Sequence, residues 1–156
     1  MSDHAKPRLI VPGMAGLYAA GAWIAWPLIR VVCGLFLMPH GAQKLFGWFG
    51  GYGLAATGEM FATRLGLQPG FLMALLAGLV ELVGGSLLVL GLLTRPAALA
   101  VVVMMAVAVF AVHLPSGFFW QDGGFEYPLM WGLIALAIFF RGGGRLSLDR
   151  AIGHEL

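Results

Sequence analysis

Two ionisable side chains, Arg30 and Glu81, lie inside long apolar runs of the sequence. A charge inside such a run costs roughly 2.5–3.5 kcal/mol on membrane-insertion scales, so each of them requires a partner or a role. Both lie near the middle of their runs, and an Arg30–Glu81 ion pair would neutralise both charges. Two interpretations of Glu81 stay open: a structural ion pair, or a carboxyl group that carries a proton or binds a polar head group.

Mostly small residues share the helical face of Glu81, at spacings of three, four and seven positions. They are Ala74, Ala77, Gly78, Gly85 and Leu88. Because small-residue stripes let helices approach closely, we expect Glu81 to point toward other helices rather than toward lipid.

A second group of polar residues flanks the apolar runs and could converge at one rim of a helix bundle. Its members are His40, Lys44, His113, Asp122 and Glu126. Two histidines with carboxylates could ligate zinc, copper or iron. The spacings HxxxH, HExxH and CxxC are absent, however, so nothing in the sequence specifies coordination. Capping of helix ends or orientation of a substrate is the favoured interpretation, and we expect no metal.

Aromatic residues gather in two segments that connect the apolar runs. One segment holds Phe46, Trp48, Phe49 and Tyr52, and the other holds Phe118, Phe119 and Trp120. Such residues form belts at membrane interfaces. They could also form a slot for a flat ring such as a quinone, because aromatic faces stack on rings. In that case His113 and Glu126 would exchange the protons that quinone reduction requires. Cys33 lies among apolar residues, where a thiol is usually inert.

The composition explains why these residues are best considered in a membrane. Of 156 residues, 60% are hydrophobic and 10% are charged, whereas an ordinary globular domain is roughly 25% charged. One domain of this size cannot bury so much apolar surface, so lipid must cover it. A soluble enzyme, a disordered chain and a disulfide scaffold are excluded. The nine lysines and arginines make no footprint for nucleic acid.

Four apolar runs approach or reach the roughly 20 residues that a membrane-spanning helix needs. They are Trp23–Pro39, Phe71–Leu93, Pro96–Leu114 and Phe125–Phe140. Their apolar character is continuous, whereas barrel strands alternate, so the sequence predicts helices. The predicted fold is an all-α, membrane-spanning four-helix bundle over residues 23–141. Residues 1–22 form an interfacial lead-in, and residues 142–156 form a tail. Residues 54–65 have the spacing of an amphipathic helix on the outer membrane surface.

Basic residues predict the orientation of these spans. Lys6, Arg8, Arg95, Arg141, Arg145 and Arg150 would lie on one side, and Lys44 and Arg64 on the other. This excess places both termini in the cytoplasm and the protein in the inner membrane as a multi-pass protein. A cleaved signal peptide ending near Ala20-Gly21-Ala22 is the competing interpretation of the N-terminal segment. We expect the segment to be retained.

Four motifs resemble the DoxX family of small integral membrane proteins, in order, over about residues 28–152. They are Arg30…Gly34-Leu35-Phe36…His40-Gly41…Lys44-Leu45-Phe46-Gly47, then Glu81-Leu82-Val83-Gly84-Gly85 continuing to Gly91-Leu92-Leu93-Thr94-Arg95, then His113-Leu114…Gly117-Phe118-Phe119…Gly124-Phe125-Glu126-Tyr127-Pro128, and Gly144-Arg145-Leu146-Ser147-Leu148-Asp149. The resemblance implies a four-helix membrane protein that works near the quinone pool, since relatives are associated with a quinol oxidase and with thiosulfate:quinone oxidoreductase. The positions that match the motifs are Arg30, His40, Lys44, Glu81, His113, Glu126 and Tyr127.

The leading hypothesis is a membrane oxidoreductase subunit that exchanges electrons and protons with quinone at a polar pocket open to the outer side. The expected catalytic residues are Glu81, His113, Glu126 and Arg30. The expected substrate-binding residues are His40, Lys44, Trp48, Phe118, Phe119, Trp120 and Tyr127, with Lys44 and His40 able to hold a thiosulfate-like anion. One cysteine cannot hold an iron–sulfur cluster, and no flavin motif is seen, so a partner redox protein or a homo-oligomer is expected. A small-molecule binder or transporter and a non-catalytic assembly subunit are the alternatives.

Overall fold

The computed structural model describes residues 8–155, and within that range it contains helices and no strand. The elements are η1 Pro12–Met14, α1 Ala15–Phe46, η2 Trp48–Gly50, α2 Gly53–Arg64, α3 Gly70–Leu79, η3 Val80–Gly84, α4 Gly85–Leu90, α5 Thr94–Val107, η4 Ala108–His113, η5 Leu114–Ser116, η6 Trp120–Asp122, α6 Glu126–Arg141 and α7 Leu148–Ile152. The predicted all-α class is confirmed. Lys6, the first seven residues of the predicted lead-in and the last residue of the tail lie outside the described residues.

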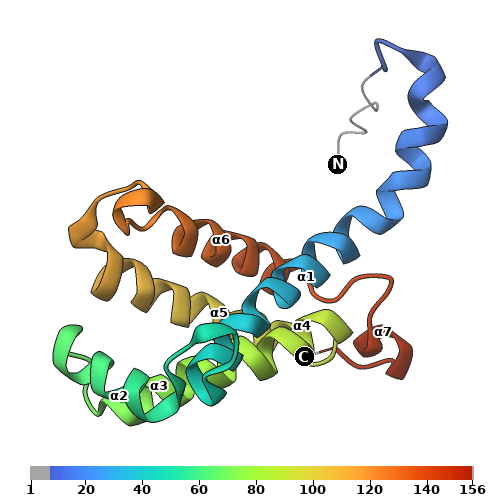
Figure 1. Ribbon diagram of the computed structural model, residues 1–156. Helices are drawn as coiled ribbons and strands as arrows, with labels where there is room; N and C mark the ends of the chain where they lie inside the picture. The colour runs from blue at the N-terminus through green and yellow to red at the C-terminus, as the bar shows by residue number, and fades with distance from the viewer. Residues whose placement is uncertain (1–7, 156) are drawn as a thin grey trace.

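The first helix is longer than the predicted span. α1 continues through Pro27 and Pro39 and ends at Gly47, whose φ is 73° and whose N–H donates to the Gln43 carbonyl at 3.2 Å. The predicted end at Pro39 is therefore wrong, since the flanking turns hold the helix together across the proline. Figure 1 shows the first part of α1 leaving the bundle and turning away from it.

Three helical segments have the length and apolar character of membrane spans. They are Pro12–Phe46, Gly70–Leu90 and Thr94–Ser116. The second joins α3 and α4 through the π-helical segment η3, and the third continues α5 through the π-helical segment η4. α6 has 16 residues, slightly fewer than the range of about 17–25 for a span. The fourth span therefore stays a prediction.

Close glycine contacts pack α1 against α3, η3 and α4, antiparallel to them. A Cβ on Gly34 would meet the Gly85 carbonyl oxygen, and a Cβ on Gly41 would lie 2.5 Å from the backbone nitrogen of Leu82. The predicted stripe of small residues is thus a helix interface, as expected from the need for close approach. The core beside it contains Cys33, Leu88, Val101 and Ile138, all fully buried, and α6 packs on α5.

The amphipathic helix predicted over residues 54–65 is present as α2. It does not lie alone, because Gly58 approaches the start of α3: a Cβ on Gly58 would be 2.8 Å from the Cα of Phe71. Its position on the outer membrane surface stays a prediction.

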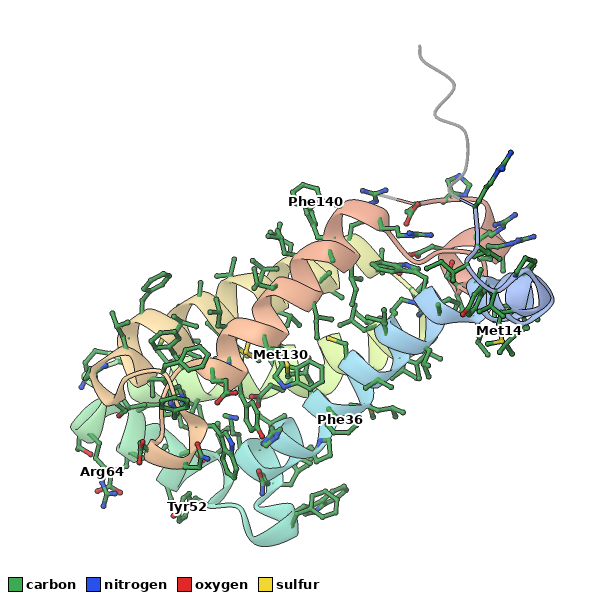
Figure 2. The ribbon with its side chains drawn as sticks, turned by 90° about the horizontal axis from the view of Figure 1, so that it is seen from above. Met14, Phe36, Tyr52, Arg64, Met130 and Phe140 are labelled. Carbon is green, nitrogen blue, oxygen red and sulfur yellow. The ribbon has the colours of Figure 1, made fainter. Side chains whose placement is uncertain are left out.

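The two ends of the bundle are named here by the segments they hold. The loop end contains residues 47–69 and 114–125, and the tail end contains the α4–α5 turn and residues 142–155. At the tail end the chain returns after α6 and forms the short α7, for which Ser147 is the N-cap: the Arg150 N–H donates to the Ser147 hydroxyl at 3.2 Å. Figure 2 shows the bundle from above, with Arg64 and Tyr52 near one end and Met14 near the other.

Candidate functional site

A buried ion pair between Lys44 and Glu81 lies in the half of the bundle nearer the loop end. The Lys44 Nζ donates to both carboxylate oxygens of Glu81, at 2.7 Å each. The Glu81 side chain is 9% exposed and the Lys44 side chain 24% exposed. The bridge thus joins α1 to the second span inside an apolar environment, where an unpartnered charge would be costly.

The local backbone around Glu81 departs from a regular α-helix. Glu81 belongs to η3, in which the helix widens to i→i+5 hydrogen bonding, a feature that is frequent at functional sites. His40 lies one helical turn before Lys44 on α1 and is exposed. The structure therefore brings together two predicted residues, Lys44 and Glu81, with His40 one turn away on the same helix.

Arg30 does not pair with Glu81, and this expectation is corrected. Glu81 is eight residues before Val89 on the second span, and it is Val89 and Leu88 whose carbonyls Arg30 contacts, the Val89 contact at 3.2 Å. Eight residues of helix correspond to about 12 Å along the axis. The expectation failed because α1 crosses the second span with residues 30–46 rather than 23–39, so Lys44 takes the place assigned to Arg30.

Arg30 and Asp149 instead join the segments of the tail end. The Arg30 guanidinium also donates to the Leu146 carbonyl, and is 1% exposed. The Asp149 carboxylate accepts from the backbone N–H groups of Leu93 at 2.7 Å and Thr94 at 2.9 Å. These are N–H groups at the start of α5, which no helical carbonyl can satisfy. The two charged side chains therefore hold the α4–α5 turn and the tail against α1.

Asp149 is a structural residue that the sequence reasoning did not single out for any role. Burial alone would raise the pKa of Asp149, but hydrogen bonds from Leu93 and Thr94 and the nearby guanidinium outweigh burial, so the pKa lies below its ordinary value. Gly91, at φ 66°, leaves room for that guanidinium, since a Cβ there would meet the Arg30 Nη1. Asp149 lies two residues after Ser147, and a serine followed by an acidic residue in the first turn is typical of a helix start. This spacing was the signal that the sequence offered.

His113 and Glu126 hold the second connecting segment of the loop end. The His113 Nδ1–H donates to the Gly123 carbonyl at 2.6 Å, which leaves Nε2 as the nitrogen that can accept a proton. A Glu126 carboxylate oxygen accepts from the Trp120 N–H at 3.2 Å. Among residues 8–155, no hydrogen bond or ion pair links either side chain to the Lys44–Glu81 pair. These residues thus form a second cluster at the same end.

The predicted aromatic residues form separate groups in the structure. Trp48 contacts Phe46, with ring centroids 5.2 Å apart. Trp120 is stacked on Tyr127, with centroids 5.4 Å apart and planes 11° apart. The remaining ring contacts of the second segment join Phe118 to Phe119 and Phe125. No ring contact in the described part of the chain joins Trp48 to this second group, so the slot that includes Trp48 stays a prediction.

A metal site would need several ligating side chains close together. Within the described residues no group of three or more His, Cys, Asp or Glu side chains could hold a metal ion. Asp122, the remaining predicted polar residue of the rim, is exposed and belongs to η6. Two cavities of about 430 and 300 Å³ both lie at the tail end rather than beside the Lys44–Glu81 pair.

Comparison with known proteins gives a family match and relatives that align over most of the chain. The family model named DoxX matches residues 25–114. An uncharacterized protein of Haemophilus influenzae is 36% identical over 124 residues, covering 78% of this chain and 85% of the relative. A second one from that organism is 29% identical over 132 residues, covering 85% of each. An uncharacterized membrane protein of Mycobacterium tuberculosis is 33% identical over 139 residues, covering 81% of this chain and 80% of the relative. No solved structure is significantly similar.

Proposed function

The chain is a member of the DoxX family of membrane proteins, and from that premise we propose that it is a membrane oxidoreductase subunit that exchanges protons and electrons with the quinone pool. The observation that carries the proposal is the Lys44–Glu81 ion pair, which joins two helices that are long and apolar enough to span a membrane and which involves a π-helical segment. Ionisable groups at this depth are functional-site hypotheses by default, because their insertion cost has to be offset.

The residues at the loop end fit a quinone in their chemistry. A quinone carbonyl accepts hydrogen bonds, and Lys44 carries three N–H donors, of which the Glu81 carboxylate takes two. The Lys44 side chain is 24% exposed, so one side of its ammonium group can be approached. Exposed rings of Trp48, Phe118, Phe119 and Trp120 at the same end can pack against a flat ring.

Proton exchange is the part of the chemistry that this chain can supply. A bound quinone supplies a two-electron, two-proton reduction to quinol. Glu81 holds and releases a proton next to the Lys44 ammonium group. The Nε2 of His113 and the carboxylate of Glu126 pass protons between that site and water at the loop end.

The electrons in this proposal come from a small sulfur anion such as thiosulfate. Two thiosulfate ions that join through a new S–S bond release two electrons and no proton, so both protons must come from water through side chains. Lys44 and His40 provide the positive charge that attracts the anion. A partner redox protein or a second copy of this chain carries the electrons where donor and quinone do not meet.

The test is mass spectrometry of an organic extract from gently purified protein. We expect about one quinone per chain in the wild type and much less in Glu81→Gln. Glu59→Gln is the matched control, because Glu59 is an exposed glutamate of α2. Thiosulfate-dependent reduction of an added quinone by the protein in native membranes should fall in Glu81→Gln in the same way. An extract that contains only bulk lipid, or a Glu81→Gln protein with full activity, contradicts the proposal.

A second candidate function is a non-catalytic assembly subunit of a membrane redox complex. The observation that favours it is that Arg30 and Asp149 bind backbone groups of this chain and leave no charge directed at a substrate. On this hypothesis the Lys44–Glu81 pair only joins helices. Replacing both residues with apolar ones of similar size, Lys44→Met with Glu81→Leu, should then leave cellular function intact.

A further inference from the structure

The smaller cavity at the tail end combines aromatic and basic walls. It has a volume of about 300 Å³ and lies between the first part of α1 and the turn that follows α6. The residues that line it are Ala19, Ala22, Trp23, Trp26, Pro27, Arg141, Gly144 and Arg145. One wall is therefore apolar and the other carries two guanidinium groups.

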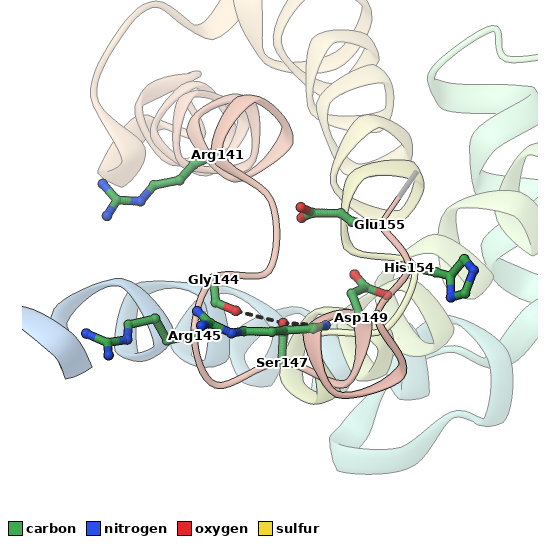
Figure 3. A pocket seen from close by; sticks show the side chains of 9 residues that line it. Arg141, Gly144, Arg145, Ser147, Asp149, His154 and Glu155 are labelled. Carbon is green, nitrogen blue, oxygen red and sulfur yellow. Dashed lines mark hydrogen bonds between the residues drawn. The ribbon is translucent and has the colours of Figure 1, made fainter.

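These two arginines have no anionic partner in the part of the chain that the structure describes. Neither Arg141 nor Arg145 forms a salt bridge there, whereas Arg95 lies 3.7 Å from Glu155. The guanidinium of Arg141 lies over the Trp26 ring, 4.9 Å from its centroid. Figure 3 draws the residues that line the larger cavity, and in it Arg141 and Arg145 extend toward the same side of the tail, away from Asp149 and Glu155. The smaller cavity is thus lined by two positive charges and by no carboxylate.

Backbone contacts fix the shape of this cavity. The Trp26 Nε1–H donates to the Gly142 carbonyl at 2.9 Å and ties α1 to the chain after α6. Gly144, at φ 75°, lies so close that a Cβ there would be 2.7 Å from Trp26 Cδ1. A larger residue with a Cβ would have to move the indole or the tail. The cavity is accordingly held on both sides rather than formed by loose surface chains.

The first part of α1 shows which molecule the cavity meets. This part turns away from the bundle in Figure 1 and runs across the long axis of the bundle near Met14 in Figure 2. Trp23 is exposed. A Cβ added to Gly16 or Gly21 would meet no other atom within 4 Å, so nothing packs against these positions. Residues 15–29 of α1 carry no charged side chain. An uncharged helix with exposed tryptophan, positioned where the spans end, is typical of a membrane interface.

We propose that this cavity binds an anionic phospholipid, with its phosphate between Arg141 and Arg145 and an acyl chain along Trp23 and Ala19. Arginine is suited to the phosphate, because its planar fork donates two parallel hydrogen bonds. A free inorganic anion is a poorer occupant than a lipid, because the apolar wall makes no favourable contact with such an ion. Arg141 and Arg145 also line the larger cavity, but Asp149 and Glu155 line that cavity too and make it the poorer anion site.

The site can be tested by native mass spectrometry of the full-length protein in mild detergent. Purified protein is incubated with phosphatidylglycerol or with phosphatidylcholine, whose choline neutralises its own phosphate. We expect one phosphatidylglycerol per chain to be retained in preference to phosphatidylcholine. Each basic side chain near an anionic lipid surface contributes roughly fivefold in affinity, the equivalent of ~1 kcal/mol, so Arg145→Gln should lose about fivefold and Arg141→Gln with Arg145→Gln about 25-fold.

Matched variants separate a lipid site from a general loss of folding or of charge. Arg64→Gln removes an exposed arginine of α2 at the loop end and should retain phosphatidylglycerol. Arg141→Lys keeps the charge next to Trp26 and should retain most of it, whereas Trp23→Ala should weaken lipid retention. The proposal is overturned if the two lipids are retained equally, if Arg145→Gln and Arg64→Gln behave alike, or if inorganic phosphate at millimolar concentration displaces the lipid.

Discussion

Removing one partner of the Lys44–Glu81 pair should lower the free energy of unfolding, by an amount that depends on which charged side chain remains. Breaking a buried pair costs about 3–5 kcal/mol, because the remaining charge stays buried without compensation. Lys44→Met leaves the Glu81 carboxylate, whose side chain is 9% exposed, whereas Glu81→Gln leaves the Lys44 ammonium, whose side chain is 24% exposed. A lysine stem can turn toward water at the loop end and carry its charge out.

We therefore expect Lys44→Met to lower the free energy of unfolding by about 3–4 kcal/mol, near the cost of an uncompensated buried charge. Glu81→Gln should cost about 1–2 kcal/mol, because the ammonium can leave and the amide oxygen still accepts a hydrogen bond. The variant with Lys44→Met and Glu81→Leu should lie within about 1 kcal/mol of the wild type, since a matched apolar pair pays no desolvation cost.

The assay is unfolding in mixed micelles with increasing sodium dodecyl sulfate, followed by tryptophan fluorescence. All three variants and the wild type are compared at neutral pH in the same micelle composition. The argument from exposure fails if Glu81→Gln is as destabilised as Lys44→Met. It also fails if the double variant is no more stable than Lys44→Met alone, because the cost would then lie in packing rather than in charge.

Two further predictions concern the tail end and the helix interface. Asp149→Asn should lower the free energy of unfolding by about 2 kcal/mol at pH 7, because an amide cannot accept from both N–H groups at the start of α5. The pKa of Asp149 is lowered in the folded protein. The extra stability of the wild type over Asp149→Asn is therefore complete above the ordinary aspartate pKa of about 4 and shrinks as the pH falls below it. Melting curves of both proteins from pH 7 to pH 3 should converge in acid. Gly41→Ala should cost about 1–3 kcal/mol in the same unfolding assay, because its Cβ would lie 2.5 Å from the Leu82 nitrogen and would push α1 away. Gly21→Ala, which has nothing within 4 Å, is the control and should be neutral or stabilising; equal losses in the two alanine variants would refute the close-packed interface.

The sequence predicted the class and most helix positions because both depend on composition. The run Phe71–Leu93 corresponds to Gly70–Leu90, and Pro96–Leu114 corresponds to Thr94–Ser116, to within a few residues. The first span was predicted too short at both ends, since Trp23–Pro39 lies inside the helical segment Pro12–Phe46. The buried positions Leu37 and Gly41 continue across that proline at helical spacing, and this spacing was the signal for a longer helix.

The sequence alone does not predict which charged residues pair with one another. Which residue reaches Glu81 depends on how far α1 slides along the second span, and the close approach of Gly34 to the Gly85 carbonyl fixes that position. Several glycines in each helix would have allowed other positions. The π-helical widening at Glu81 could not be predicted either, since its residues have no composition that distinguishes them from an α-helix.

Charged side chains have different partners at the two ends of the bundle. At the tail end, Arg30 and Asp149 bind backbone carbonyl and N–H groups, which keep their partial charges at every pH. Such contacts hold segments together but give a proton nowhere to go. In the other half, the Glu81 carboxylate accepts from the Lys44 ammonium group rather than from the backbone. A molecule that accepts a hydrogen bond from Lys44 would compete with Glu81 for that ammonium group. The proposed proton exchange is therefore assigned to the Lys44–Glu81 pair, whereas Arg30 of the first motif holds segments of the chain together.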